Sequence, residues 1–283
     1  MNKKLFNPAY LKSLCEKYGL RPSKRYGQNF LISEKPINAM IEAAELKKTD
    51  TVIEIGPGFG VLTFAVAPLV ERVMAFEIER KLERYWDEVR NKEINGNSVE
   101  IIWGDVLRNW KLEIGNWRSG YKVVANIPYQ ITSNALRVML ESENKPERIV
   151  VMVQKEVAER ICAKPGEMSL LAVSVQYYGE PKIICRVPRG SFWPEPKVDS
   201  AIVLINTPTR QRDNIFSDEE FFRVVRAGFA RPRKQVWRNL SAGLKLDGDR
   251  IKDVLKEIAG NEKVRAQELS VLQWKDVVVN GER

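Results

Sequence analysis

The sequence contains no histidine, and this absence excludes several kinds of active site. Without an imidazole there is no Ser–His–Asp or Cys–His arrangement, no histidine-ligated metal, and no side chain whose ordinary pKa lies near neutrality. Unperturbed carboxylates and lysines titrate outside the interval from about pH 6.5 to 8.5. We therefore expect a reaction that needs no group titrating near neutral pH.

Cysteine is also scarce, and long apolar runs are missing. Cys15, Cys162 and Cys185 are odd in number and far apart, which argues against a disulfide framework and against a CxxC zinc site. No metal site is expected. The chain has no run of about 18 apolar residues and no signal-peptide pattern, so we expect a soluble, cytoplasmic protein without a membrane span.

The charge that is present is mainly positive. There are 46 Lys and Arg residues against 37 Asp and Glu residues, which leaves a formal net charge of +9. Between residues 223 and 238 six basic residues and no acidic one are interleaved with Phe229 and Trp237. Such a stretch suits an RNA backbone with stacked bases, and a solvated helix face is the alternative.

The hydrophobic pattern predicts an α/β fold. Apolar, β-branched runs predict strands at residues 51–55, 72–76, 99–103, 121–125, 148–153 and 201–205. Helical periodicity occurs between several of them, for example at residues 36–46, 61–70 and 132–141. This alternation predicts a mostly parallel, doubly wound sheet. Residues 207–212 have the composition of a linker, and the periodicity after them is helical to residue 283. We therefore expect an S-adenosylmethionine-binding catalytic domain at 1–206 and a small α-helical RNA-binding domain at 207–283.

A glycine-rich turn follows the first of these strands. Gly56, Gly58 and Gly60 stand between strand 51–55 and a helical stretch, where glycines let the backbone approach a ligand at a helix N-terminus. A dinucleotide fingerprint would require a glycine where Val61 stands. The G-x-G-x-G spacing instead resembles the S-adenosylmethionine loop of class I methyltransferases. A glycine turn without a ligand is the alternative.

Two acidic residues follow the next two strands. Glu77 lies 21 residues after Gly56, about where a carboxylate accepts ribose hydroxyls. Asp105 is placed to accept from the adenine amine of a cofactor, with Val106 packing on the adenine ring. A surface glutamate and an ordinary turn aspartate are the alternatives.

The turn at residues 126–129, Asn-Ile-Pro-Tyr, ends the strand at 121–125. An asparagine, a constrained backbone carbonyl and an aromatic ring at the end of a strand suit the binding of a base through its exocyclic amine. The amine of adenine is a poor nucleophile because its lone pair is delocalised into the ring. The Asn126 side-chain oxygen and the Ile127 carbonyl can accept both amine hydrogens, and Pro128 restricts Ile127 to extended conformations that aim this carbonyl. Tyr129 can stack on a base taken out of its helix. The alternative is a plain turn in which the asparagine caps a helix.

Several stretches together are similar to one family. They are residues 27–31 (Gly-Gln-Asn-Phe-Leu), 54–60 (Glu-Ile-Gly-Pro-Gly-Phe-Gly), 104–105 (Gly-Asp), 126–129, 153–160 (Val-Gln-Lys-Glu-Val-Ala-Glu-Arg) and 192–200 (Phe-Trp-Pro-Glu-Pro-Lys-Val-Asp-Ser). In this order they resemble the ribosomal RNA adenine N6,N6-dimethyltransferases, from about residue 21 to 240 and more weakly beyond. The resemblance implies a Rossmann-like class I methyltransferase sheet. Departures are a short segment after residues 164–166 and the Pro and Trp within 231–240.

The resemblance also implies residue roles. The residues expected to contact S-adenosylmethionine are Gln28, Asn29, Leu31, Gly56, Gly58, Glu77, Ile78, Asp105, Val106 and Asn126. Asn126, Ile127, Pro128 and Tyr129 would hold the target adenine, and Phe192 would stack on its other side.

The family methylates two neighbouring adenines, each twice, in a hairpin loop near the 3′ end of small-subunit ribosomal RNA, late in subunit assembly. A monomer acting on that RNA is expected. The alternatives are a single-site large-subunit enzyme of the erythromycin-resistance type, a non-catalytic ribosome-assembly factor and, disfavoured by Val61, a nicotinamide-dependent oxidoreductase.

Overall fold

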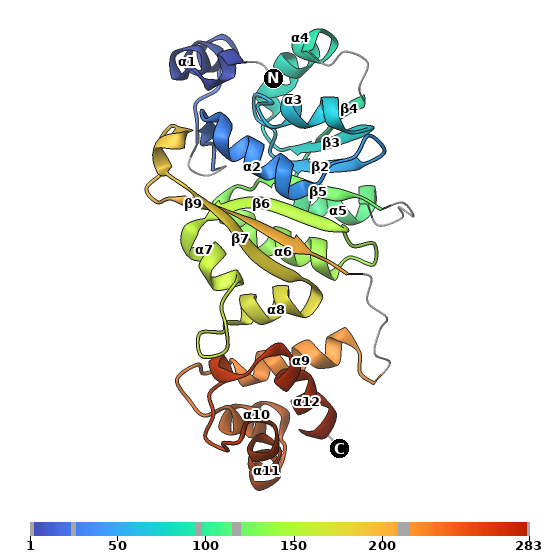
Figure 1. Ribbon diagram of the computed structural model, residues 1–283, viewed down its shortest axis with the longest axis vertical. Helices are drawn as coiled ribbons and strands as arrows, with labels where there is room; N and C mark the ends of the chain where they lie inside the picture. Colours follow the sequence, from blue (N-terminus) through green and yellow to red (C-terminus); the bar gives the residue numbers. More distant parts are fainter. Residues whose placement is uncertain (1–2, 24–26, 94–97, 115–119, 209–214, 282–283) are drawn as a thin grey trace. The chain divides into compact units, whose positions relative to one another are not determined.

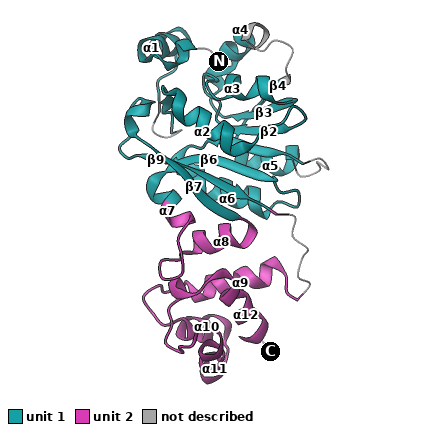
Figure 2. Cartoon of the chain, in the orientation of Figure 1, with its two compact units in different colours: residues 1–158, 180–207 teal, residues 159–179, 208–283 magenta. Residues whose placement is uncertain are grey.

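A computed structural model describes residues 3–23, 27–93, 98–114, 120–208 and 215–281 (Figure 1). Its contacts divide the chain into two compact units (Figure 2). Unit 1 comprises Met1–Ala158 and Glu180–Thr207, and unit 2 comprises Glu159–Gly179 and Pro208–Arg283. The boundary predicted after residue 206 leaves residues 159–179 with the sheet, whereas these contacts group them with the C-terminal helices. The functional division into two domains stays a prediction.

Unit 1 is built on a sheet with the strand order β4-β3-β2-β5-β6-β9-β7 among the described residues. The strands are β2 (Thr51–Ile55), β3 (Arg72–Glu77), β4 (Ser98–Trp103), β5 (Lys122–Asn126), β6 (Arg148–Gln154), β7 (Glu180–Val187) and β9 (Ser200–Asn206). β2 to β6 pair in parallel, and β9 pairs antiparallel with both β6 and β7. The predicted, mostly parallel α/β sheet is confirmed, and its antiparallel end was not predicted.

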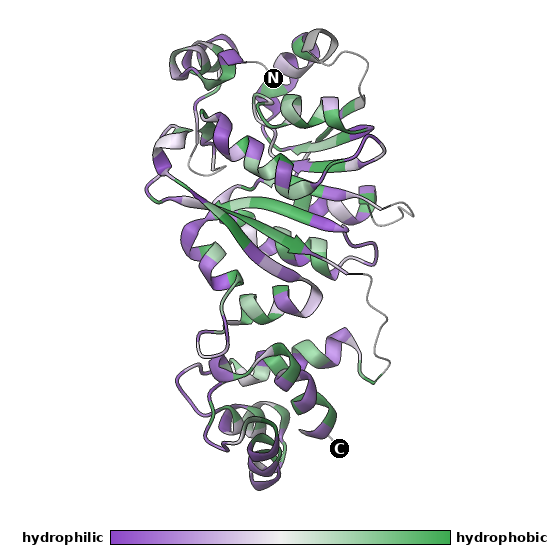
Figure 3. Ribbon diagram, in the orientation of Figure 1, coloured by the Kyte–Doolittle hydropathy of each residue, from purple (hydrophilic) through white to green (hydrophobic). Residues whose placement is uncertain are grey.

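The central strands are largely apolar, as Figure 3 shows for β6. Residues 149–153 of β6 and 122–125 of β5 are all buried. A strand buried on successive residues is covered on both faces, which is the usual state of parallel sheets. The covering helices of unit 1 are α2 (Glu34–Ala44), α3 (Thr63–Val66), α4 (Glu83–Glu93), α5 (Val106–Ile114) and α6 (Thr132–Glu141). The next helix, α7 (Lys155–Ile161), begins in unit 1 and ends in unit 2.

An N-terminal segment precedes the sheet and consists of η1 (Lys3–Phe6) and α1 (Pro8–Lys17). The Asn7 side chain caps α1 by accepting from the Ala9 N–H at 2.9 Å, and Pro8 occupies the first helical position, where it needs no hydrogen-bond donor. Gly19 follows the helix with a φ of +63°. These residues set the start and the end of α1.

A second, two-stranded sheet joins distant parts of unit 1. β1 (Phe30–Leu31) pairs antiparallel with β8 (Phe192–Trp193), and the Phe30 and Trp193 rings stack with centroids 6.3 Å apart. Neither short strand is recognisable from its periodicity. The pairing brings two of the sequence motifs side by side.

Unit 2 consists of packed helices in its described part: α8 (Leu170–Tyr178), α9 (Asp218–Gly228), α10 (Val236–Leu244), α11 (Gly248–Ala259) and α12 (Val271–Gly281). Asp218, in the first turn of α9, accepts hydrogen bonds from the hydroxyls of Tyr177 and Tyr178 on α8. The Tyr177 ring also stacks on Phe221 at 4.1 Å. These contacts explain why residues 170–178 group with the C-terminal helices.

Candidate active site

One edge of the parallel sheet carries the predicted site residues. Gly56 follows β2, Glu77 ends β3, Asp105 comes two residues after β4, and Asn126 ends β5. Parallel strands end at the same edge, where ligands bind in open α/β sheets. A cavity of about 260 Å³ lies there. It is lined by every residue predicted for the cofactor: Gln28, Asn29, Leu31, Gly56, Gly58, Glu77, Ile78, Asp105, Val106 and Asn126.

The glycine turn has a backbone that other residues adopt only with strain. Gly56, Gly58 and Gly60 have φ values of +71°, +55° and +80°. A Cβ at Gly60 would lie 2.7 Å from the Phe64 ring and 2.8 Å from the Trp86 ring, so a side chain there is excluded. The turn is fixed by Trp86, whose Nε1 donates to the Gly58 carbonyl at 3.0 Å.

Glu77 is held beside this turn. One of its carboxylate oxygens accepts the Gly58 N–H at 3.0 Å, and the other accepts the Glu79 N–H at 2.8 Å. Burial raises the pKa of this carboxyl, and the backbone donors partly oppose that rise. Each oxygen retains acceptor capacity for a further donor such as a ligand hydroxyl.

Ile78 and Val106 provide apolar surface next to polar groups. Ile78 is 45% exposed although it lines the cavity. Asp105 caps α5, since its Oδ1 accepts the Leu107 N–H at 3.0 Å. An exposed aliphatic side chain beside carboxylates fits a ligand that carries both a flat apolar ring and hydroxyl or amine donors. The residues present therefore fit an adenosyl cofactor.

The Asn126 turn lies beside the glycine turn in the cavity wall. A Cβ at Gly56 would lie 3.8 Å from the Pro128 ring, and Asn126 and Pro128 both line the cavity. The Ile127 N–H is fixed by the Met152 carbonyl at 3.2 Å. Among the described residues no hydrogen bond uses the Asn126 side-chain amide or the Ile127 carbonyl. Both acceptors remain available to a ligand.

Three of the predicted base-holding residues do not line the cavity. The Ile127 side chain is buried, which leaves its backbone carbonyl as the functional group. Tyr129 is half-buried, and its hydroxyl is 2.7 Å from the Ser200 Oγ. Phe192 is 3% exposed and packs in the core. The structure does not bring the Phe192 ring to the cavity, and its stacking role stays a prediction.

Sequence reasoning missed Glu54. This carboxyl lines the cavity, is buried, and accepts a hydrogen bond from the Thr63 hydroxyl at 2.6 Å. Burial raises its pKa to about 8. The pKa of Glu54 therefore lies within the interval that unperturbed carboxylates avoid. Glu54 stands two residues before the first glycine, but no local pattern indicates that its side chain is buried.

Other residues that line the cavity were not recognisable as site residues from the sequence. Leu5 and Leu11 belong to the N-terminal segment, and Met40 belongs to α2. Their apolar spacing is that of ordinary core residues. Only the fold shows that they form part of a cavity wall.

The basic stretch of unit 2 is exposed, but its aromatic residues are packed. Arg231, Arg233 and Lys234 are exposed in a turn before α10. The Phe229 ring lies 5.6 Å from the Trp274 ring. The Trp237 ring packs against Gly248, since a Cβ added to Gly248 would lie 3.4 Å from that ring. The basic residues fit phosphate contact, whereas both aromatic residues pack within unit 2.

Comparison with known proteins gives consistent matches. A family model described as ribosomal RNA adenine dimethylase matches residues 19–279. Ribosomal RNA small subunit methyltransferase A of Dehalococcoides mccartyi strain BAV1 is 42% identical over 267 residues, covering 94% of this chain and 91% of the relative. The protein of the same name from Bacillus cereus strain B4264 is 37% identical over 281 residues, covering 96% and 95%.

Two solved structures share the fold over most of the chain. A dimethyladenosine transferase from Plasmodium falciparum has a TM-score of 0.70 at 25% identity, covering 87% of this chain and 95% of that chain. The 23S rRNA methyltransferase ErmE has a TM-score of 0.71 at 25% identity, covering 90% and 100%.

The sheet order, the glycine turn and the acidic residues at the strand ends define a Rossmann-like methyltransferase. Within that class, the family match over residues 19–279 and the identities of 42% and 37% decide the family. The chain belongs to the ribosomal RNA adenine dimethylase family. The family predicted from the motifs is confirmed, and the protein is an enzyme that transfers methyl groups.

Proposed function

We propose that this enzyme uses S-adenosylmethionine to dimethylate the N6 atoms of two adjacent adenines in the 3′-terminal hairpin loop of small-subunit ribosomal RNA. The observation that carries the proposal is the Asn126 turn. Its two acceptors, the Asn126 amide oxygen and the Ile127 carbonyl, are unused by the described residues, and the turn that carries them adjoins the glycine turn. The names of the two relatives support the small subunit as the source of the RNA.

The cofactor assignment is supported by the cavity lining. When bound, S-adenosylmethionine supplies a methyl group on a positively charged sulfur, which leaves as a neutral thioether. Glu77 would accept ribose hydroxyls, Asp105 would accept the adenine amine, and Ile78 with Val106 would contact the adenine ring. Gly56 and Gly58 let the backbone come close to the ligand, with no Cβ between them.

The Asn126 turn would act on the target base. Its two acceptors would bind both hydrogens of the amine, which favours a pyramidal nitrogen with a localised lone pair. These groups are held before the base arrives, because the Ile127 N–H is bonded to Met152 and Pro128 has a φ of −53°. Preorganised dipoles of this kind stabilise developing charge without a reorganisation cost during the reaction. Tyr129 would stack on the base, and Phe192 is the second stacking candidate.

The RNA and the cellular setting complete the proposal. An adenine in a hairpin loop is easier to take into a pocket than one in a duplex, because it is already partly unstacked. The exposed basic turn at residues 231–234 would contact RNA phosphates. We expect a monomer that acts in the cytoplasm on the assembling subunit. No helix in the described ranges is long and apolar enough to cross a lipid bilayer.

A second candidate is methylation of large-subunit RNA. The similarity to ErmE, with a TM-score of 0.71, favours it as the alternative because the fold alone does not separate the two substrates. The identity to ErmE is 25%, against 42% and 37% to the small-subunit enzymes. This difference favours small-subunit RNA.

The experiment that tests the function uses unmethylated small subunits, large subunits and cofactor with a labelled methyl group. We expect label only in small-subunit RNA, with two neighbouring adenines each carrying two methyl groups after mapping by mass spectrometry. Label in a single large-subunit adenine would establish the second candidate. Absence of label from both RNAs would contradict both candidate substrates.

A further inference from the structure

The N-terminal segment forms part of the cofactor cavity although no motif marks it. Leu5 from η1 and Leu11 from α1 line the cavity, and each is 1% exposed. Both belong to the hydrophobic cluster that also contains Phe59 of the glycine turn. The position of η1 and α1 therefore helps to shape the cavity wall.

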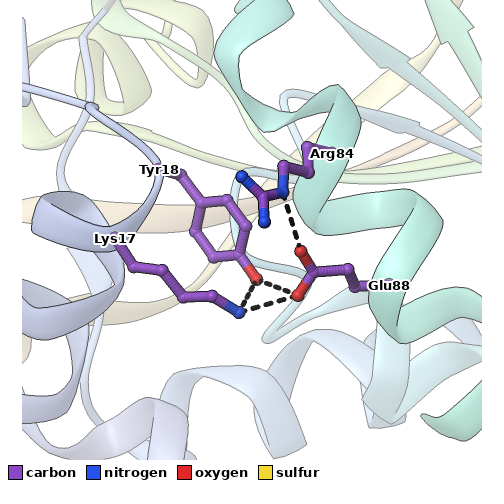
Figure 4. Close-up of polar contacts among 4 residues, drawn as sticks. All are labelled: Lys17, Tyr18, Arg84 and Glu88. Carbon is purple, nitrogen blue, oxygen red and sulfur yellow. Dashed lines mark hydrogen bonds and ion pairs between the residues drawn. The ribbon is translucent and has the colours of Figure 1, made fainter.

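The end of α1 is tied to α4 through Glu88 (Figure 4). One oxygen of Glu88, Oε2, accepts from the Lys17 ammonium at 2.7 Å and from the Tyr18 hydroxyl at 2.8 Å. The other oxygen, Oε1, accepts from the Arg84 Nε at 3.0 Å, within α4. The hydrogen bonds from Lys17 and Tyr18 lower the pKa of Glu88 to about 2, so the carboxylate is charged throughout the neutral range.

The same helix holds the glycine turn. The Tyr85 hydroxyl donates to the Phe59 carbonyl at 2.7 Å, while the Tyr85 ring meets the Tyr18 ring edge-on at 5.5 Å. Tyr85 and Glu88 are three residues apart in α4 and share one helix face. This face of α4 therefore connects the end of α1 with the glycine turn.

We propose that Glu88 is a positioning residue for cofactor binding. It holds Lys17 and Tyr18 so that Leu5 and Leu11 stay in the cavity wall beside the glycine turn. The inference rests on the proposed function, because the ligand is the cofactor named there. Glu88 touches neither the cavity nor the reacting atoms, since it is absent from the cavity lining.

The test measures binding of S-adenosylhomocysteine, the cofactor without its methyl group, by calorimetric titration of the full chain. Glu88→Ala should raise the Kd about fivefold, the size expected when an exposed ion pair with good geometry is lost. Tyr18→Phe keeps the ring on Tyr85 and should raise the Kd about twofold. Arg84→Ala is the matched control, because it removes a partner of Glu88 without touching α1, and its Kd should stay within about 1.5-fold of the wild type.

Three further measurements separate positioning from a general loss of stability. In a double-mutant cycle, Lys17→Ala combined with Glu88→Ala should bind no more weakly than Glu88→Ala alone, because the two residues act through one contact. Single-turnover rates at saturating cofactor should stay within about twofold of the wild type, since the Asn126 turn is unchanged. Glu100→Ala, which removes an ion pair with Arg72 elsewhere on the sheet, should leave the Kd unchanged.

The outcomes distinguish the two claims. A wild-type protein that binds no S-adenosylhomocysteine would overturn the proposed cofactor itself. A wild type that binds, with Glu88→Ala binding equally well, would overturn the role of Glu88 alone. An equal loss of affinity in Arg84→Ala would place the effect within α4 and would also overturn it.

Discussion

The Thr63 hydroxyl donates to the buried Glu54 carboxyl at 2.6 Å, and this contact ties β2 to α3 on either side of the glycine turn. Burial raises the pKa of Glu54 to about 8, against an ordinary value of 4.5. The folded protein therefore binds a proton at this carboxyl between these two values, whereas the unfolded chain does not. Linkage then requires that stability falls as the pH rises through this interval.

Glu54→Gln should remove this pH dependence. Glutamine resembles the protonated acid and can still accept from Thr63, so the variant carries no ionisation penalty. Between pH 6 and 8 the unfolding free energy of the wild type should fall relative to the variant by up to about 1.4 kcal/mol per pH unit. Denaturant unfolding at several pH values gives the comparison. Parallel curves for the two proteins would show that Glu54 is already ionised at pH 6.

Thr63→Val provides the complementary variant. The Thr63 hydrogen bond favours the charged carboxylate and so lowers the pKa of Glu54. Its removal should raise the pKa of Glu54 in the folded protein, so that the loss of stability continues to higher pH. The same denaturation series measures this shift, and a shift to lower pH would contradict the assignment.

Tyr129 should act through its ring more than through its hydroxyl. Tyr129→Phe loses only the contact with Ser200, so kcat/KM for the RNA should stay within about threefold of the wild type. Tyr129→Ala loses the stacking surface, which is worth about 1–3 kcal/mol per base, or about 5- to 150-fold in kcat/KM. Steady-state assays on small subunits measure both variants. Equal losses in the two would assign the role to the hydroxyl instead.

The basic turn of unit 2 should contribute phosphate contacts. Asn239 fixes this turn by donating to the carbonyls of Gly228 and Arg231, which leaves Arg231, Arg233 and Lys234 exposed. Replacing these three basic residues with Ala should lower the slope of log affinity against log salt by roughly two to three units. Filter-binding titrations at several salt concentrations measure the slope.

A charge-matched triple variant controls for the loss of net charge. Lys47→Ala, Lys111→Ala and Lys256→Ala remove three exposed cations from other elements. The slope of this variant should stay close to that of the wild type. If both triple variants lower the slope equally, the effect comes from total charge and the turn makes no specific contacts.

The sequence predicted the sheet and the cavity for the same physical reason. Apolar runs such as residues 51–55 mark strands that are buried on both faces, and polar residues placed directly after them must gather at one edge. That rule brought Glu77, Asp105 and Asn126 together. It gave no information on contacts between distant segments, so the pairing of β1 with β8 and the wall formed by Leu5 and Leu11 were not predicted.

Besides contacts between distant segments, the burial of individual side chains was not predicted from the sequence. Phe192 was predicted at the site from its motif, yet β8 pairs with β1 and packs its ring into the core. Glu54 stood in the motif at residues 54–60 without a site role, yet burial raises its pKa to about 8. Both differences arise from packing across residues far apart in the chain, which local patterns do not encode.

Asn126→Ala should abolish most turnover and leave cofactor binding largely intact. The variant removes one of two acceptors for the target amine, and loss of a group aimed at developing charge costs about 100- to 1000-fold in rate. Calorimetric titration with S-adenosylhomocysteine and single-turnover rates test the two halves of the prediction. Turnover within about threefold of the wild type would contradict the amine-holding mechanism.

The last prediction concerns the pH dependence of the chemical step. The methyl donor is already electrophilic, so the amine needs acceptors for its hydrogens more than it needs a strong base. Asn126 does not titrate, the chain has no histidine, and burial raises the pKa of Tyr129 above its usual value. After transfer the nitrogen is briefly cationic and can lose its proton to water. The rate should therefore be nearly flat from about pH 6.5 to 8.5, because ordinary carboxylates and lysines titrate outside that range.

Glu54 provides a direct test of this prediction. It lines the cavity, and with a pKa of about 8 it would titrate within the same pH range. Single-turnover rates at saturating cofactor and RNA should be flat in the wild type and equally flat in Glu54→Gln, even though the stability of the wild type changes with pH. A log-linear rise of slope one in the wild type would contradict this account and reveal an essential titrating group. If Glu54→Gln abolished that rise, the titrating group would be Glu54.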